Sequence, residues 1–156
     1  METSLRREVC DHVEANRDRL VDFLADLVEA PSVPGDEREA QSVVVDRLES
    51  LGLEVDVWEA DVEALRDHPG YFDTSTYEEH GYEDRPNVAA TVEGAGDGPS
   101  IGLAGHIDVV SVSEAQWSHD PWSATVEDGR LYGRGACDMK GGLAANLFAL
   151  EALLEL

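Results

Sequence analysis

The sequence has little lysine, little cysteine and no long apolar runs. Lys140 is the single lysine, and the two cysteines, Cys10 and Cys137, stand far apart with no C-x-x-C spacing. Neither a disulfide framework nor a cysteine zinc site is indicated, so we expect two small buried thiols. The charged N-terminus has no apolar signal segment, and no apolar run approaches the roughly 18 residues of a membrane span. We therefore expect a cytoplasmic protein with no membrane partner.

Positive charge of any kind is scarce. The chain carries 11 lysine and arginine residues against 34 aspartate and glutamate residues, which gives a formal net charge of −23. Such an excess of one sign weakens a compact state in ordinary buffer and is tolerated where salt screens it. The composition therefore predicts a halophilic protein. It argues against a nucleic-acid partner, because nucleic-acid binding requires a basic surface.

Hydrophobic periodicity predicts a single domain of alternating helices and strands, because a chain of about 150 residues can bury a substantial core. Helices are predicted over residues 4–30, 36–51 (capped by Asp36) and 140–156. Strands are predicted over residues 53–58, 87–94 and 100–107, with a hairpin over 123–133 that turns at Asp128–Gly129. Residues 61–86 read as a long excursion with one helical turn near 62–66. This order predicts a layered α/β domain with its site beyond the strand ends.

A histidine and an aspartate stand two positions apart at the end of the predicted strand 100–107. His106 and Asp108 can lean to the same side, because alternate residues of an extended chain share a face. A nearby carboxylate can accept the second N–H of the imidazole and leave its other nitrogen free to bind a metal. A solvent-facing polar pair at a strand end has the same pattern, so this motif alone leaves both interpretations open.

A second polar group lies in the glycine-rich segment GRGACDMKGG, residues 133–142. Its glycines allow the backbone to approach another group closely. Asp138 either caps the helix that follows or faces a ligand. Combined with His106, the segment predicts that an imidazole and a carboxylate meet in one crevice, which are ligand types that zinc accepts. The remaining site candidates are weak: Ser100 opens a strand, His119 is expected at the surface, and Arg134 either forms a structural ion pair or contacts the site.

The segments GHIDVV and WSHDPWSATVEDGRLYGRGACDMKGG together resemble the N-terminal half of the catalytic domain of the M20 metallopeptidase family. This family includes acetylornithine deacetylase, succinyl-diaminopimelate desuccinylase, aminoacylase and glutamate carboxypeptidase. The resemblance implies an α/β, layered helix–sheet–helix metallohydrolase catalytic domain, of which residues 1–156 would be the N-terminal part. It implies two divalent metal ions, Zn²⁺ or Co²⁺, with His106 as a metal ligand, Asp108 as the catalytic aspartate that supports it and Asp138 as the bridging ligand. It also implies a cis peptide bond at Asp138–Met139.

The same resemblance implies an enzyme that hydrolyses a small N-acylated amino acid or peptide and whose full-length form is a homodimer. The family's glutamate pair follows the bridging aspartate, whereas the adjacent glutamates of YEEH, residues 77–80, precede it and are not assigned that role. The last helix has no cap or turn after it, so Leu156 is expected to mark a truncation. We therefore expect the inserted substrate and dimerisation domain and the rest of the catalytic domain to be absent and the chain itself to be inactive. A dipeptidase or carboxypeptidase, and a non-catalytic fragment or gene remnant, remain the alternatives.

Overall fold

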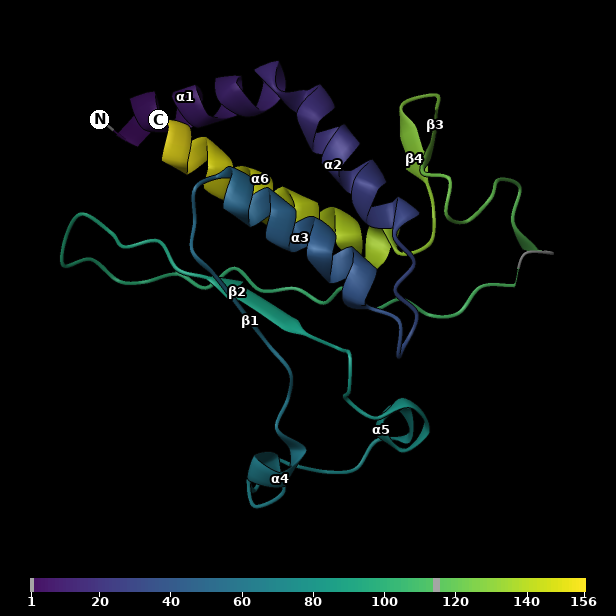
Figure 1. The fold of residues 1–156 in the computed structure, drawn as a ribbon. Helices are drawn as coiled ribbons and strands as arrows, with labels where there is room; N and C mark the ends of the chain where they lie inside the picture. The colour runs from purple at the N-terminus through teal and green to yellow at the C-terminus, as the bar shows by residue number, and fades with distance from the viewer. Residues whose placement is uncertain (1, 114–115) are drawn as a thin grey trace.

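The computed structural model describes residues 2–113 and 116–156. Four longer helices gather on one side of the molecule, and extended segments run beneath them (Figure 1). These helices are α1 (Glu2–Ala15), α2 (Arg17–Glu29), α3 (Arg38–Ser50) and α6 (Gly141–Glu155). Within the part of the chain that the structure describes, no helix has the length and apolar character needed to cross a bilayer.

The core lies where α2, α3 and α6 meet. Apolar side chains recur along α2 and α3 at intervals that place them on one face, whereas α6 is apolar around most of its circumference, and burial of these surfaces against each other stabilises the fold. Ile107, from the extended segment beneath the helices, belongs to the same cluster. The buried members are Phe23, Leu27, Ala30, Ala40, Val44, Leu48, Ile107, Ala144 and Leu147.

The first predicted helix, residues 4–30, is wrong as a single element, because the chain forms α1 and α2 with a break at Asn16. Asn16 leaves the helical conformation, and both its backbone N–H and its side-chain amide donate to the carbonyl of His12. Asparagine favours such local bonds over helix continuation. The two halves keep the same apolar spacing, so periodicity alone did not reveal the break.

Helix α3 begins one residue later than a cap at Asp36 would place it. Glu37, not Asp36, occupies the N-cap position, and its side chain makes no capping bond. The Glu37 carboxylate is buried and accepts hydrogen bonds from the guanidinium group of Arg85. The prediction that Asp36 caps this helix is therefore wrong, because the adjacent glutamate takes the cap position and serves a tertiary ion pair.

Two predicted strands pair with each other in an antiparallel sheet. Strand β1 (Val55–Trp58) lies beside β2 (Asn87–Ala90), with Val55 opposite Ala90 and Trp58 opposite Asn87. Helix α3 packs on this pair from above (Figure 1). A two-stranded sheet has only marginal stability on its own in water, so the packing of α3 against β1 and β2 stabilises this one.

The predicted strand over residues 100–107 is not formed. These residues are extended but join no ladder, since the two sheets of the described chain contain only β1 with β2 and β3 with β4. Ile101 and Leu103 are exposed there, whereas Ile107 is buried under the helices. A strand requires a hydrogen-bonding neighbour in addition to a suitable sequence, and no neighbour pairs with this segment among the residues described.

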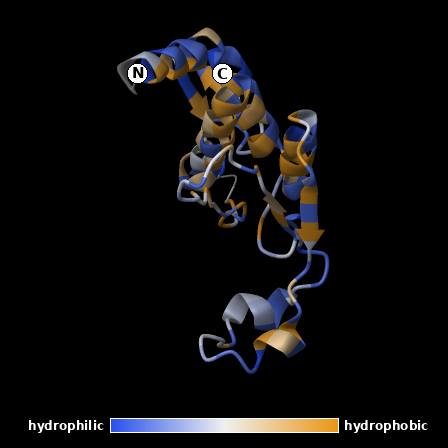
Figure 2. Cartoon of the chain, turned by 90° about the vertical axis from the view of Figure 1, so that its left-hand side faces the viewer, coloured by the Kyte–Doolittle hydropathy of each residue, from blue (hydrophilic) through white to orange (hydrophobic). Residues whose placement is uncertain are grey.

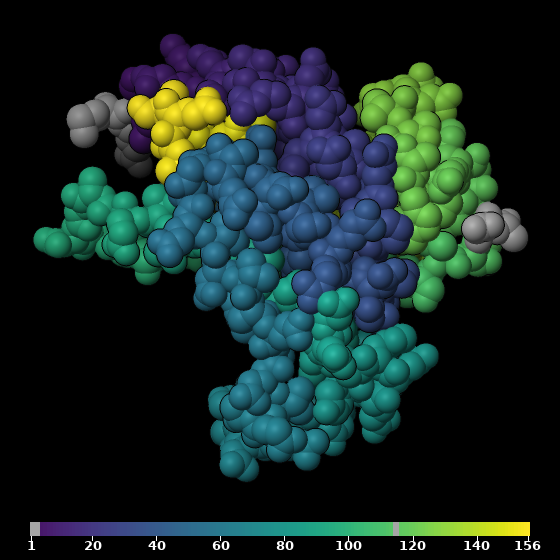
Figure 3. Space-filling view, in the orientation of Figure 1, coloured from purple at the N-terminus to yellow at the C-terminus, as the bar shows by residue number. Residues whose placement is uncertain are grey.

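Residues 59–86 form the predicted excursion, which projects away from the helices as a separate lobe (Figures 2 and 3). It contains the predicted turn as α4 (Val62–Leu65) and a second short helix, α5 (Ser75–His80), that the sequence analysis missed. The side chain of Thr74 caps α5 by accepting a hydrogen bond from the N–H of Tyr77. Threonine before a helical turn was a usable signal for this element.

The C-terminal third contains a hairpin and the last helix as predicted. Strands β3 (Thr125–Glu127) and β4 (Arg130–Tyr132) pair through a turn in which Asp128 and Gly129 both have positive φ. The observed fold is thus a mixture of helices and small antiparallel sheets, consistent with a fragment of the α/β class. The second helical layer of the predicted helix–sheet–helix arrangement stays a prediction.

The two cysteines are both exposed, which contradicts the expectation that they are buried. Cys10 lies on the outer face of α1, where it faces away from the helical core. Cys137 lies in the glycine-rich segment, between Ala136 and Asp138. Both thiols are free.

Candidate metal centre

The structure brings together the three residues that the sequence singled out. His106 Nε2 lies 3.1 Å from Asp138 Oδ1, and His106 Nδ1 lies 3.2 Å from Asp108 Oδ1. Asp108 and Asp138 thus contact opposite nitrogens of one imidazole ring, although Asp138 comes from a segment 32 residues further along the chain. The three side chains meet as predicted, but not in a common crevice, because Asp138 is almost fully exposed, and their roles as ligands stay a prediction.

The segment that carries Asp138 is a kinked helical turn, η2 (Ala136–Lys140), directly before α6. Asp138 and Met139 have non-helical backbone angles there, and the peptide bond between them is cis, as the resemblance implies. The N-cap position of α6 belongs to Lys140, and no side chain caps the helix. Asp138 therefore does not cap α6, and its carboxylate, 88% exposed, is directed to His106 and solvent.

The glycines of this segment bring the two halves of the site together. A Cβ built on Gly135, whose φ is +77°, would lie 2.3 Å from Cγ1 of Val109, and one on Gly133 would lie 2.2 Å from Cγ1 of Val28. Neither position leaves room for a side chain, and Gly135 also adopts a conformation that favours glycine. The close approach expected for these glycines is confirmed, and the groups that they approach belong to the protein itself.

Asp108 fixes which nitrogen of His106 is available. Both the carboxylate and the backbone carbonyl of Asp108 lie within hydrogen-bond distance of Nδ1, the latter at 3.1 Å. A proton on Nδ1 can be donated to either oxygen, and the neutral ring then presents the lone pair of Nε2. Such a carboxylate partner orients a ligating histidine and raises the basicity of its free nitrogen.

The pKa of His106 is raised above its ordinary value. Partial burial acts in the opposite direction, but the hydrogen bond to the Asp138 side chain and the contacts with Asp108 outweigh it. The two carboxylates therefore concentrate negative charge around the ring and favour a cation at this point. Either a proton on the ring or a divalent metal ion beside it would supply positive charge there.

The donor set fits one edge of a zinc or cobalt site. Two ligand atoms bound at about 2.0–2.1 Å to a tetrahedral zinc lie roughly 3.3 Å apart, which is close to the observed Nε2–Oδ1 separation. The side chain of His106 is 47% exposed and that of Asp138 is 88% exposed, so an ion can reach both without displacing the fold. His106 and Asp138 are the residues that would hold it.

The ligand set within this chain is incomplete. Among residues 2–113 and 116–156, no group of three or more histidine, cysteine, aspartate or glutamate side chains is arranged to hold a metal ion. Asp108 does not add a third ligand, because it contacts the nitrogen that faces away from Asp138. A catalytic zinc normally has three protein ligands, so the described residues supply only part of such a set.

The other candidates lie apart from this centre. His119 contacts the ring of Tyr132 and lies 3.6 Å from Glu127 on the hairpin, in agreement with a surface role. Arg134 stacks over the ring of Trp117, with the guanidinium carbon 5.2 Å from the ring centroid. This contact is neither of the two roles proposed for Arg134, since it forms no ion pair among the described residues.

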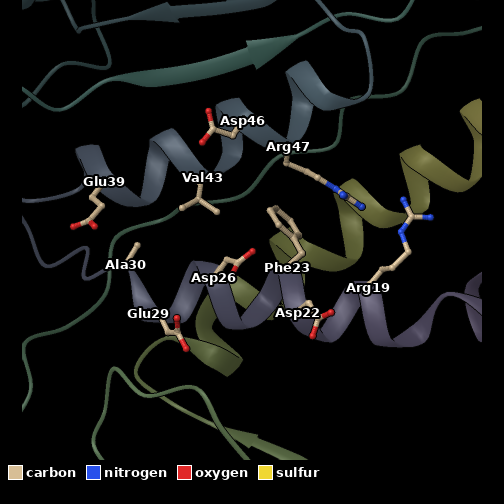
Figure 4. A pocket seen from close by; sticks show the side chains of 10 residues that line it. All are labelled: Arg19, Asp22, Phe23, Asp26, Glu29, Ala30, Glu39, Val43, Asp46 and Arg47. Carbon is tan, nitrogen blue, oxygen red and sulfur yellow. The ribbon is translucent and has the colours of Figure 1, made fainter.

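Two cavities differ in their relation to this centre. A small cavity of about 210 Å³ adjoins His106 and Asp108 and is also lined by Tyr82 and Arg85, at the end of the excursion. A larger groove of about 760 Å³ runs between α2 and α3, with an acidic rim and a floor of Phe23, Ala30 and Val43 (Figure 4). No residue of the proposed centre lines the larger groove, and the smaller cavity is lined by His106 and Asp108 but not by Asp138.

Two buried residues that the sequence analysis did not assign support this centre. Ser32 Oγ donates to the carbonyl of Ile107 at 2.7 Å, and Lys140 Nζ donates to the carbonyls of Leu27 and Ala30 at 2.7 and 2.8 Å. Both side chains are fully buried. Because Lys140 is the one lysine in a chain whose other basic residues are arginine, the sequence could have marked it as a special position. Nothing in the sequence distinguishes Ser32 in this way.

Lys140 is expected to make stability depend on pH. Burial lowers its pKa to about 8 from 10.5. Between these values the unfolded chain holds a proton that the folded chain has released, so the free energy of unfolding rises with pH. The rise from this group is expected to reach about 3 kcal/mol. Denaturant unfolding from pH 7 to pH 11 in high salt, compared with Lys140→Met, measures it; parallel profiles for the two proteins would contradict the assignment.

Comparisons with known proteins identify relatives of this chain. The sequence profile of peptidase family M20/M25/M40 matches residues 102–156, which include His106, Asp108 and Asp138. The succinyl-diaminopimelate desuccinylase of Methylobacterium radiotolerans is 39% identical over 130 residues, which cover 83% of this chain and 28% of that protein. The N-formyl-4-amino-5-aminomethyl-2-methylpyrimidine deformylase of Halalkalibacterium halodurans is 35% identical over 156 residues, covering 96% of this chain and 32% of that protein.

A second succinyl-diaminopimelate desuccinylase, from Xanthobacter autotrophicus, is 40% identical over 129 residues, covering 82% of this chain and 29% of that protein. The chain belongs to the M20 peptidase family, as the sequence motifs indicated. It spans less than a third of the length of these relatives.

Proposed function

We propose that residues 1–156 form the N-terminal part of the catalytic domain of a metal-dependent amidohydrolase that removes the acyl group from an N-acylated amino acid. Acetylornithine deacetylase and succinyl-diaminopimelate desuccinylase are the models for this activity. The approach of His106 Nε2 to Asp138 Oδ1, with Nδ1 held by Asp108, is the observation that carries the proposal. A dipeptidase or carboxypeptidase with the same half-site is the alternative within the family.

The residues of this chain have separate tasks in such a reaction. Two divalent ions, zinc or cobalt, would supply a water of lowered pKa and polarise the acyl carbonyl. His106 would hold an ion through Nε2, while Asp108, which contacts Nδ1, would orient the ring. Asp138, whose largely exposed carboxylate lies beside His106, would be the ligand that the two ions share.

The isolated chain of 156 residues is expected to show no measurable deacylase activity. Among residues 2–113 and 116–156, no third metal ligand joins His106 and Asp138, so these residues do not complete a catalytic site. The measurement is turnover of N-acetylornithine in high salt with added zinc or cobalt. Turnover that chelator abolishes and that His106→Ala eliminates would show that the chain completes its site in another way. Absence of turnover is also what the alternative of a non-catalytic fragment predicts, so the next experiment separates the two.

A chimera tests the function directly. Residues 1–156 are joined to the part of the M. radiotolerans desuccinylase that follows its matched region, and the product is assayed with N-succinyl, N-acetyl and N-formyl amino acids and with dipeptides. We expect chelator-sensitive release of an acyl group, lost in an Asp138→Ala chimera. A chimera that folds and binds zinc but hydrolyses none of these amides would contradict the deacylase proposal. Preferred cleavage of dipeptides would favour the peptidase alternative.

The composition of the chain bears on the environment in which the protein works. We further propose a cytoplasmic, salt-adapted protein whose full-length form is a homodimer and whose partners are small substrates. The net charge of −23 and the near absence of lysine support adaptation to salt. Light scattering of the active chimera in high and low salt measures the state of assembly.

A further inference from the structure

The segment that follows α2 contacts the part of the chain that carries His106 and Asp108. Ser32 is fully buried and makes two hydrogen bonds there. Its hydroxyl donates to the carbonyl of Ile107 at 2.7 Å, and its own carbonyl accepts the N–H of Val109 at 2.9 Å. These two bonds lie on either side of Asp108 and fix its backbone, although residues 100–110 form no ladder with any described strand.

The same end of α2 also holds the segment that carries Asp138. Lys140 Nζ donates to the carbonyls of Leu27 and Ala30, which lie at the end of the helix, where carbonyls lack an intrahelical partner. A cation is also favoured at the negative end of the helix dipole. Lys140 stands two positions after Asp138, so these bonds restrict where the Asp138 carboxylate can lie.

The chemistry of Lys140 explains why a lysine stands there. The other ten basic residues among lysine and arginine are all arginine. A guanidinium group is planar and broader than an ammonium group, so it cannot replace a compact donor between two carbonyls without displacing them. The one lysine of the sequence is thus found at a fully buried position whose contacts require a small cation.

Contacts between the two site segments complete this arrangement. Gly135 packs against Val109 with no room for a side chain, and the side chain of Met139 lies over Gly105, where a Cβ would come 3.2 Å from Met139 Cε. Each segment therefore contacts the end of α2 and also the other segment. A shift of either one moves His106 relative to Asp138.

We propose that Ser32 and Lys140 are positioning residues that set the separation of His106 and Asp138 for metal binding, by attaching both segments to the end of α2. This inference rests on the proposed function. Neither residue touches the metal or the substrate in this account. A purely structural role would alter stability without altering the affinity of the site for a metal ion.

The test is a Co²⁺ titration of the 156-residue chain in high salt, followed by NMR. The wild-type chain is compared with Ser32→Ala, Lys140→Met and the control Arg47→Met, which disrupts an ion pair with Glu151 at the other end of α6. Ser32→Ala and Lys140→Met are expected to weaken Co²⁺ binding at least tenfold, about the effect of removing groups that orient a ligand. Arg47→Met is expected to lose stability but to keep Co²⁺ affinity within twofold.

A metal-free measurement keeps the inference separate from the proposed function. A nuclear Overhauser effect between Gly105 and the ε-methyl group of Met139 reports that the two segments are in register, and we expect it to be lost in Lys140→Met and weakened in Ser32→Ala. If the effect is retained in both variants, the positioning role is wrong, whether or not cobalt binds. If the wild-type chain binds Co²⁺, equal affinity in all four proteins would also overturn it. The wild-type chain could bind no Co²⁺ while the Overhauser effect between Gly105 and Met139 changes in the variants as expected. In that case the metal proposal fails, and Ser32 and Lys140 still position the two segments. If Lys140→Met does not fold, Ser32→Ala decides.

Discussion

Replacing Glu151 with alanine is expected to lower the free energy of unfolding by about 3 kcal/mol. Its carboxylate is fully buried between the guanidinium groups of Arg19, from α2, and Arg47, from α3. Figure 4 shows both arginine side chains directed toward α6, the helix that carries Glu151. Removal of the carboxylate leaves two like charges facing each other, one of them on the mostly buried side chain of Arg47. Urea denaturation in high salt measures the loss.

Glu155 provides a matched control one turn further along α6. It lies 3.7 Å from Arg19 and 3.6 Å from His12, but its side chain is 45% exposed. Exposed ion pairs contribute little, so Glu155→Ala is expected to cost less than about 1 kcal/mol. Equal losses for the two variants would show that α6 is not held to α2 and α3 through the buried carboxylate.

Replacing Asp138 with alanine is expected to weaken the binding of zinc or cobalt by more than about 100-fold. Asp138 would be one of the two ligands that the described residues offer to the ion, and removal even of a group that only orients a ligand costs about 10–100-fold. Asp108→Ala is expected to fall within that smaller range, because its carboxylate contacts only Nδ1 of His106. Isothermal titration with zinc measures both affinities.

Cys137 provides the control for this series. Its thiol is exposed and directly precedes Asp138, so it is the nearest alternative metal ligand. Cys137→Ala is expected to leave the zinc affinity unchanged, because the pair of His106 and Asp138 needs no sulfur. A larger loss of zinc affinity for Cys137→Ala than for Asp138→Ala would show that the thiol, not the carboxylate, binds the metal.

The site could be predicted from the sequence further than the fold around it. His106 and Asp108 were paired by their spacing, and Asp138 was joined to them by the glycine-rich segment and the family resemblance. The physical support for them could not be predicted in the same way. Ser32 and Lys140 act through carbonyl groups of Ile107, Leu27 and Ala30, and no side-chain pattern records which backbone oxygens a fold leaves unpaired.

Elements with strong local signals were predicted, and those that depend on distant partners were not. The turn at Asp128–Gly129 is local, since both residues tolerate positive φ, and the hairpin formed there. The segment 100–107 has an apolar sequence suited to a strand, yet it pairs with nothing among the described residues. Asn16 interrupts a helix that periodicity continued, because a single side-chain bond to a carbonyl does not alter the apolar spacing.

The most direct test of the proposed metal centre is an anomalous difference map at the zinc edge, from crystals of the 156-residue chain grown with zinc. The account predicts a peak within about 2.0–2.2 Å of both His106 Nε2 and Asp138 Oδ1, with Asp108 still bonded to Nδ1. A map with no peak between these two atoms, or with its strongest peak at Cys137 or His119, would contradict it.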